Sequence, residues 1–282
     1  MKVYKIETGN FKIDGGAVFG VIPKTMWEKQ YPADEKNLCN LSMRSLLIKT
    51  NDKLVLIDAG MGNAQDEKFT RYFYQNGTDT LVQSVQNAGY KTGDITDVLF
   101  THLHHDHMAG AFWIDDNGIL AEIFPNARYW TGKKQWDWAT NPNIREWAAF
   151  KQPFLTALEA TGRLQLVDDG FLLCPEIQLK MVNGHTRGMM VPCVETPKGK
   201  LIFVTDLIPV MANVSPIWLS AYDIEPLTAI AEKETFLHQA AQNGHIFFFQ
   251  HDLYHECCHI NKTDKGFSPS KPFSLESVFN PV

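Results

Sequence analysis

The sequence predicts an α/β fold made of two similar β-rich halves. In each half, a strand that ends in Asp is followed by a helical stretch and then by a strand that ends in His. The interval from Asp58 to His102 is 44 residues, and the interval from Asp206 to His251 is 45 residues. Similar elements at matched spacing indicate an internal duplication, although an α/β chain can give such a match by chance. Strands this apolar are most simply buried as two sheets with helices outside them.

Residues 1–282 are expected to form one domain, with halves at approximately 1–160 and 161–282, because no Pro-, Gly- or Ser-rich linker separates the copies. A net charge of −6 with scattered basic residues gives no footprint for nucleic acid. The start has no apolar signal-peptide region, and no apolar run is long enough to cross a bilayer. Five cysteines do not make a disulfide framework in a chain of this length, so a cytoplasmic location is expected.

Local patterns place the elements of the first half. The stretch 46–60, LLIKTNDKLVLIDAG, reads as a hairpin whose second strand ends at Asp58. Helical spacing of apolar residues predicts a helix within 78–90, with a glycine as its stop. The short apolar run 95–100, ITDVLF, predicts a buried strand. The stretch 133–160 is predicted to be mostly helical, interrupted by two prolines.

The second half gives the same kinds of signal. The stretch 176–182, EIQLKMV, alternates apolar and polar residues as a half-exposed strand does. A second hairpin is predicted over 191–206. The stretch 225–244 reads as an amphipathic helix that ends at an Asn-Gly pair, and 245–251, HIFFFQH, reads as a buried strand.

A cluster of histidines follows the predicted strand at 95–100. The letters HLHHDH contain the pattern His-x-His-x-Asp-His, formed by His102, His104, Asp106 and His107. Histidine is a very common metal ligand, and imidazole with carboxylate suits zinc, iron, manganese or cobalt. The absence of cysteine from the motif disfavours a structural zinc site. The alternative is a solvated loop that happens to be rich in histidine.

Three further residues stand where a predicted strand runs out into a loop: His185 in NGHTRG, Asp206 in FVTDL and His251 in FFQHD. Singly, each is more simply a hydrogen-bonded histidine or an Asp that forms a turn or caps a helix. The case for a metal site depends on the whole set, whose later members follow His107 at intervals of 78, 21 and 45 residues.

The order and spacing of this set resemble the metallo-β-lactamase superfamily, and most closely the N-acyl homoserine lactonases and related metal-dependent hydrolases. The resemblance covers roughly Met43 to His251 and is most specific at the His-x-His-x-Asp-His motif. It implies a four-layer αββα sandwich built from two similar halves. It also implies the metal ligands, which are His102, His104 and His185 for one metal, Asp106, His107 and His251 for the other, and Asp206 as a bridge between them. Asp58 would support the metal-binding loop from behind the ligands.

The implied activity is that of a binuclear hydrolase holding two divalent metal ions, with zinc favoured and manganese, iron or cobalt open. A metal-bridging hydroxide would attack an ester, lactone or related bond of a small-molecule substrate, and Asp106 would pass a proton to the leaving group. A phosphodiesterase or phosphotriesterase, a thioester hydrolase like glyoxalase II, and an iron-dependent redox enzyme are the alternatives. No nucleic-acid or membrane partner is expected, and a monomer and a homodimer both remain open.

Three departures from the family pattern bear on the substrate. Well-studied lactonases carry a tyrosine three residues after the bridging Asp, where this chain has Pro209. Tyr222 and Arg187 are the alternative donors to a substrate carbonyl. Arg187 itself replaces a proline of the family motif, and Met189 replaces a histidine, so the polar network around His185 must differ.

Other residues carry weaker hypotheses. Phe19, Phe112 and Trp218 are candidates for an apolar substrate wall, with burial in the core as the alternative. On a helix, His255 and His259 would share a face beside Cys257 and Cys258, which makes a third metal site conceivable. Incidental side chains are the favoured interpretation of that segment, because the seven-ligand set is complete without them.

Overall fold

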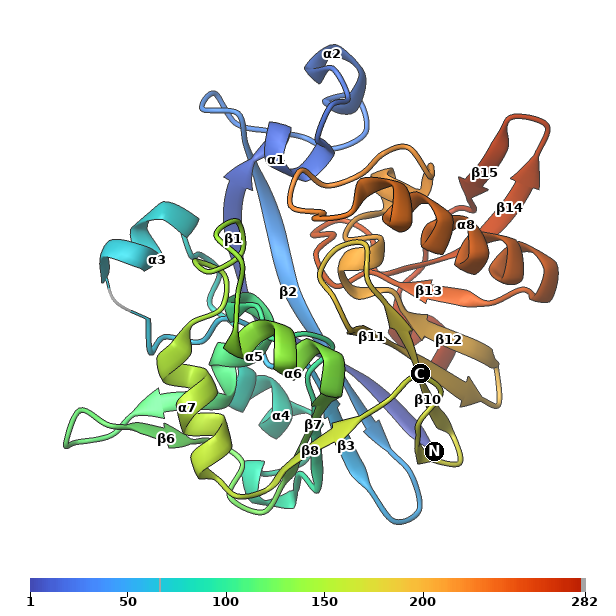
Figure 1. Ribbon diagram of the computed structural model, residues 1–282. Coiled ribbons are helices and arrows are strands. Elements are labelled where there is room, and N and C mark those ends of the chain that lie inside the picture. The colour runs from blue at the N-terminus through green and yellow to red at the C-terminus, as the bar shows by residue number, and fades with distance from the viewer. Residues whose placement is uncertain (66, 280–282) are drawn as a thin grey trace.

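The structure is a computed structural model that describes residues 1–65 and 67–279. Two large sheets make up its centre, and Figure 1 shows the first half of the chain, in blue and green, beside the second half, in yellow to red. The first sheet has the order β1 (Lys2–Asp14), β2 (Leu38–Lys49), β3 (Leu54–Ile57), β4 (Asp97–Leu99), β7 (Arg128–Gly132), β8 (Leu164–Val167). The second has the order β15 (Gly266–Pro269), β14 (Cys257–Thr263), β13 (Ile246–Phe248), β12 (Gly199–Phe203), β11 (Met189–Thr196), β10 (Ile177–Val182), β9 (Leu172–Cys174).

Helices and short turns connect these strands. The α-helices are α1 (Gly15–Phe19), α2 (Lys24–Trp27), α3 (Glu67–Phe73), α4 (Leu81–Asn87), α5 (His105–Met108), α6 (Lys133–Thr140), α7 (Gln152–Ala160), α8 (Pro226–Asn243) and α9 (Leu275–Phe279). A small hairpin, β5 (Phe112–Ile114) with β6 (Leu120–Glu122), stands apart from both sheets. Short 3₁₀ turns occur at Thr92–Asp94, Ala109–Ala111, Thr205–Leu207 and Met211–Val214.

Apolar clusters define four layers. One cluster joins Leu46 and Ile57 of the first sheet to Leu179 and Phe203 of the second, so the two sheets pack face to face. Helices α4 and α7 cover the outer face of the first sheet, where their apolar residues pack with those of β2, β3 and β4. Helix α8 covers the outer face of the second sheet through Leu237 and its neighbours. The predicted αββα sandwich is therefore confirmed.

The predicted elements of both halves form. The hairpin at 46–60 is β2 with β3, and the run at 95–100 contains β4. Helix α8 ends where expected, because Gly244 adopts the left-handed conformation (φ +67°) that closes a helix. The chain changes sheet between β8 and β9, so the crossing lies a few residues later than the approximate boundary at 160.

The helix that would place His255 and His259 on one face does not form. Residues around Cys257 and His259 form strand β14 rather than a helix, and β14 pairs with β13 on one side and β15 on the other. Helical spacing of the two histidines was a weak signal, because the segment CCHI is equally compatible with the alternating faces of a strand. Both cysteines are fully buried in the sheet, and His259 faces Ile246 across the ladder.

The direction of the strands determines where the site forms. Strands β3, β4, β7 and β8 run parallel to one another, and so do β12 and β13. Carboxyl ends of parallel strands meet at one edge of a sheet, and the loops there are the usual place for binding residues. Asp58 follows β3, His102 follows β4, Asp206 follows β12 and His251 follows β13. The repeat seen in the sequence thus brings both halves' polar residues to equivalent sheet edges.

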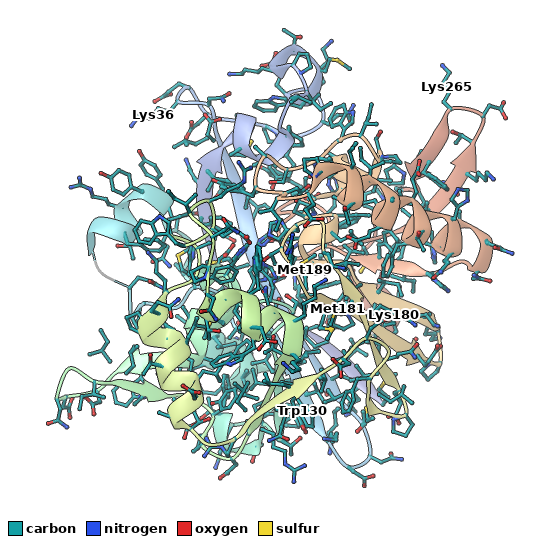
Figure 2. All side chains as sticks on the ribbon, in the orientation of Figure 1. Lys36, Trp130, Lys180, Met181, Met189 and Lys265 are labelled. Carbon is teal, nitrogen blue, oxygen red and sulfur yellow. The ribbon has the colours of Figure 1, made fainter. Side chains whose placement is uncertain are left out.

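Figure 2 shows Met189 near the centre of the molecule, whereas Lys36 and Lys265 project at its periphery. Met189 is fully buried in the apolar cluster under α8. Apolar packing therefore occupies position 189, where the family sequence pattern has a histidine. None of the helices in the described part of the chain is both long enough and apolar enough to cross a membrane.

Candidate metal centre

The structure brings the seven predicted ligands together beside the carboxyl ends of the parallel strands. Within the described residues, they form two groups that could each hold a metal ion, and in each group the candidate ligand atoms lie within 4.8 Å of one another. The first group is His102, His104, His185 and Asp206; the second is Asp106, His107 and His251. The five histidines are buried and the two aspartates are half-buried.

Asp206 lies between the two groups. Its Oδ2 is 3.1 Å from His185 Nε2 and 3.8 Å from His102 Nε2, both in the first group. The same oxygen is 3.5 Å from His107 Nε2, and Oδ1 is 2.9 Å from His251 Nε2, both in the second group. The carboxylate therefore reaches both sets of imidazoles, as a bridging ligand must.

Three histidines are held by a partner behind the site. The Nδ1–H groups donate from His107 to Asp58 (2.9 Å), from His185 to Asp223 (2.9 Å) and from His251 to the carbonyl of Ser42 (2.8 Å). Because a carbonyl only accepts, and a carboxylate accepts when ionised, each partner keeps the proton on Nδ1. Nε2 is then the ring nitrogen that faces the centre, which is the usual arrangement of a metal-binding histidine.

His104 is turned the other way. Its Nδ1 is 3.3 Å from His185 Nε2, and its Nε2 is 3.5 Å from Glu146 Oε1, which is an electrostatic contact rather than a well-formed hydrogen bond. Glu146 is fixed by Trp138 Nε1 (2.7 Å) and Asn143 Nδ2 (2.6 Å). Burial opposes its charge, but contacts with His104, Thr186 and Trp138 together lower the pKa of Glu146 to about 2. An anionic Glu146 orients His104 with Nδ1 toward the site.

The donor set fits metal ions and is poorly satisfied without them. His102 Nε2 is buried with no hydrogen-bond partner among the described residues, and Asp206 Oδ1 makes none despite its short distance to His251. Native proteins rarely leave buried polar atoms in this condition. Burial lowers the pKa of His102 well below its usual value, so its imidazole is in the neutral form that binds metals. Burial favours a neutral Asp206, but His251, His107 and His185 hold the pKa of its carboxyl well below the usual range.

The ligand groups open into a cavity of about 550 Å³. Its floor includes Asp106, Asp206 and His251, and its polar wall includes Tyr222 and Arg145. The apolar wall comes from several elements and consists of Phe11, Ile13, Val18, Leu41, Phe69 and Phe73. An apolar cavity with a few convergent polar groups is the usual form of a small-molecule site.

The three aromatic residues predicted to line the substrate wall lie elsewhere. Phe19 is fully buried, stacked on Trp27 at 5.0 Å and in edge contact with Trp218 at 6.0 Å between ring centres. Phe112 is buried in the outer cluster of the first sheet. The prediction for Phe19, Phe112 and Trp218 is therefore wrong: Phe19 and Phe112 are buried in the core, Trp218 is partly buried against Phe19, and the neighbouring Val18 faces the cavity instead.

The remaining hypotheses have clear outcomes. Pro209 lines the cavity, and so does Tyr222, one of the two alternative donors. Arg187 points away, since it pairs with Glu225 at 3.0 Å and lies 4.4 Å over the ring of Trp138. Neither metal-binding group found among the described residues includes a cysteine or histidine from the 255–259 segment, so the third metal site gains no support.

Several residues that shape the site were missed by sequence reasoning. Glu146 and Asp223 hold two of the histidines, yet each is a single acidic residue in a loop, with no motif around it. Arg44 is buried, and its guanidinium donates to the carbonyls of Asp252 and of Leu253 (3.1 Å) directly after His251. A lone Arg within the apolar strand β2 was the available signal, because buried arginine needs a partner.

The fold and this site define a class of protein: an αββα sandwich with two adjoining His/Asp groups at the edge of its sheets. A model of the metallo-beta-lactamase superfamily matches residues 44–251, and the chain belongs to that superfamily of hydrolases. An N-acyl homoserine lactonase of Bacillus cereus is 24% identical over an alignment of 245 residues, and the alignment covers 78% of this chain and 85% of the relative.

Two solved structures are similar over almost the whole chain. A probable metal-dependent hydrolase from Staphylococcus aureus has 31% sequence identity and a TM-score of 0.85, covering 96% of this chain and 98% of the other. AidC, described as a dizinc quorum-quenching lactonase in complex with an N-acyl homoserine product, has 25% identity and a TM-score of 0.80, covering 97% and 94%. The predicted closeness to the lactonases is thus confirmed.

Proposed function

We propose that this protein is a binuclear metal-dependent hydrolase of small-molecule esters or lactones. The single observation that carries the proposal is Asp206, whose carboxylate lies between two groups of imidazoles at 2.9–3.8 Å. In this proposal, the first metal is held by His102, His104 and His185, the second by Asp106, His107 and His251, and Asp206 bridges them. Imidazole and carboxylate donors without cysteine favour zinc, and the relative described as dizinc supports that choice.

The chemistry follows from where the groups lie. When bound, two divalent cations supply a water that ionises near neutral pH and a Lewis acid for the substrate oxygen. Asp106 lines the cavity, with Oδ2 3.6 Å from His107 Nε2, so it is placed to carry a proton to the leaving oxygen. The apolar wall holds the hydrocarbon part of the substrate and excludes water around the reacting carbonyl.

Tyr222 is proposed to donate its hydroxyl to the substrate carbonyl in place of the tyrosine that Pro209 replaces. It lines the cavity, and the segment that carries it is fixed at both sides. Ala221 N donates to Ala17 O (2.9 Å), and Asp223 binds His185. Burial and the nearby charge of Asp106 raise the pKa of Tyr222, which keeps the phenol protonated and able to donate.

The test of the proposed function is metal content. Protein purified without chelator should carry close to two transition metal ions per chain, because two complete ligand groups are present. His102→Ala and His251→Ala should each lose about one ion by elemental analysis, since ligand number governs affinity. His238→Ala is the control, because His238 is exposed on α8. Wild-type protein that carries no metal and takes up none on titration would refute the assignment.

A second prediction concerns substrate preference. Loss of one carbonyl donor costs about 100-fold in rate, so Tyr222→Phe should lower kcat/KM for a lactone by a factor of that order. Aryl esters have better leaving groups and should lose less. In the wild type we expect kcat/KM to be higher for an aryl ester than for a long-chain acyl homoserine lactone. All substrates are measured on one zinc-loaded preparation. A phosphotriester and a thioester are included to test the two alternative hydrolase activities. A wild-type preference for the lactone, unchanged in Tyr222→Phe, would exclude Tyr222 as the donor.

A further inference from the structure

His105 stands between two predicted ligands but belongs to neither metal-binding group. Its side chain lines the cavity and is only 7% exposed. Phe69 and Phe73 of α3 contact the imidazole edge to face, with ring centres 4.6 Å and 4.8 Å away. Its backbone N–H donates to the carbonyl of Ala149 (3.1 Å), which fixes the residue to the loop before α7. The ring is thus held rigidly in the wall of the cavity.

The imidazole of His105 is incompletely satisfied. Its Nδ1 is buried and has no hydrogen-bond partner among the described residues, and Asp106 Oδ1 is 3.8 Å away. Phe69 and Phe73, which contact the ring, offer no hydrogen bond of ordinary strength. Nδ1 is enclosed by protein, whereas Nε2 is not enclosed and makes no hydrogen bond among the described residues. Because the side chain lines the cavity, Nε2 is the atom that water or a ligand there can pair with.

We propose that His105 determines specificity by donating a hydrogen bond to an oxygen atom within the chain of the substrate. The inference rests on the proposed function and names its substrate class: an ester or lactone whose otherwise apolar chain carries an ether, hydroxyl or carbonyl oxygen. Phe11, Phe69 and Phe73 hold the hydrocarbon on the same wall. A purely hydrocarbon chain displaces water from the imidazole and leaves it unpaired, so a site of this kind discriminates against such a chain.

Isosteric substrates test the proposal. The 4-nitrophenyl ester of hexanoic acid is compared with analogues in which one methylene of the chain, at the third, fourth or fifth position, is replaced by an ether oxygen. Each kcat/KM is divided by the rate of alkaline hydrolysis of the same ester, which removes differences in intrinsic reactivity. In the wild type, this corrected kcat/KM should be about 5-fold higher for at least one analogue than for the hexanoate, which is the effect of one neutral hydrogen bond.

His105→Phe should remove that preference, because it keeps an aromatic ring between Phe69 and Phe73 and deletes the donor. His105→Gln should restore it, since the amide nitrogen of glutamine matches Nε2 in position. His238→Phe is the matched control: His238 also meets a phenylalanine ring, Phe267 at 4.7 Å, but lies outside the cavity wall. Both substrates are measured on one preparation, so the ratio does not depend on the fraction of active enzyme.

The outcomes separate this inference from the proposed function. Wild-type enzyme that cleaves the hexanoate without preferring any oxygen-containing analogue overturns the role of His105 and leaves the hydrolase assignment intact. A preference that survives in His105→Phe overturns it equally. Protein that binds two metals and cleaves neither these esters nor a lactone overturns the proposed function, and this inference with it.

Discussion

Replacing Asp206 with alanine is expected to lower kcat/KM by at least ~100-fold, the scale seen when a central electrostatic element of an active site is removed. The same change should reduce metal content below that of either single-histidine variant. The Asp206 carboxylate lies within 3.8 Å of imidazoles from both groups, so its loss weakens both metal sites at once. Two cations would also face each other with less negative charge between them, and their repulsion is strong in a buried site.

Asp206→Asn separates charge from shape. It keeps one oxygen and the size of the side chain but loses the negative charge, so we expect metal content between those of wild type and Asp206→Ala. Glu195→Gln is a control for a change of one charge, because Glu195 is exposed in the second sheet. Metal content by elemental analysis and kcat/KM on an aryl ester are the measurements. Full turnover with both metals in Asp206→Ala would make this residue an ordinary aspartate at a strand end.

The clustering of the proposed ligands could be predicted from the sequence because four of the residues at the site stand at positions that the fold repeats. Parallel pairing of β3 with β4 and of β12 with β13 places the residue after each strand at one edge. Apolar runs that end at or shortly before Asp58, His102, Asp206 and His251 are visible as letters in the chain. Strand-end position is therefore a property that a sequence can show, and the convergence of the ligands follows from it.

The supporting residues could not be predicted in the same way. Glu146 and Asp223 reach their histidines from loops whose path depends on the packing of α6, α7 and α8, and nothing in their neighbours distinguishes them from other surface acids. The prediction of the aromatic residues that line the cavity was wrong for a related reason. Phe19 and Val18 are adjacent, and only the orientation of α1 decides that the larger ring packs on Trp27 while the smaller side chain faces the cavity.

The largest expected loss of stability follows from Asp58→Ala. Asp58 is fully buried and accepts three hydrogen bonds, from the N–H of Thr101 (2.7 Å), the hydroxyl of Thr101 (2.8 Å) and Nδ1–H of His107 (2.9 Å). These bonds hold the turn after β4, where the ligand motif begins. Alanine would leave the N–H of Thr101 and Nδ1–H of His107 buried and unpaired, whereas the hydroxyl of Thr101 keeps its contacts with His102 Nδ1 (3.1 Å) and Thr205 Oγ1 (3.0 Å). Breaking such a buried arrangement costs about 3–5 kcal/mol in the free energy of unfolding. The left-handed backbone conformation at position 58 (φ +58°) is also better tolerated by Asp or Asn than by Ala.

The measurement is denaturant unfolding of metal-free protein, followed by metal affinity from chelator competition. Removing a group that orients a metal-binding histidine typically lowers metal affinity by about 10- to 100-fold, and His107 loses its only partner on Nδ1 among the described residues. Asp58→Asn keeps the backbone preference and an acceptor oxygen, so its loss in both measurements should be smaller. Comparing the two variants separates the hydrogen bonds from the charge. Wild-type stability and wild-type metal affinity in Asp58→Ala would show that the turn after β4 is held by packing alone and that His107 needs no orienting partner.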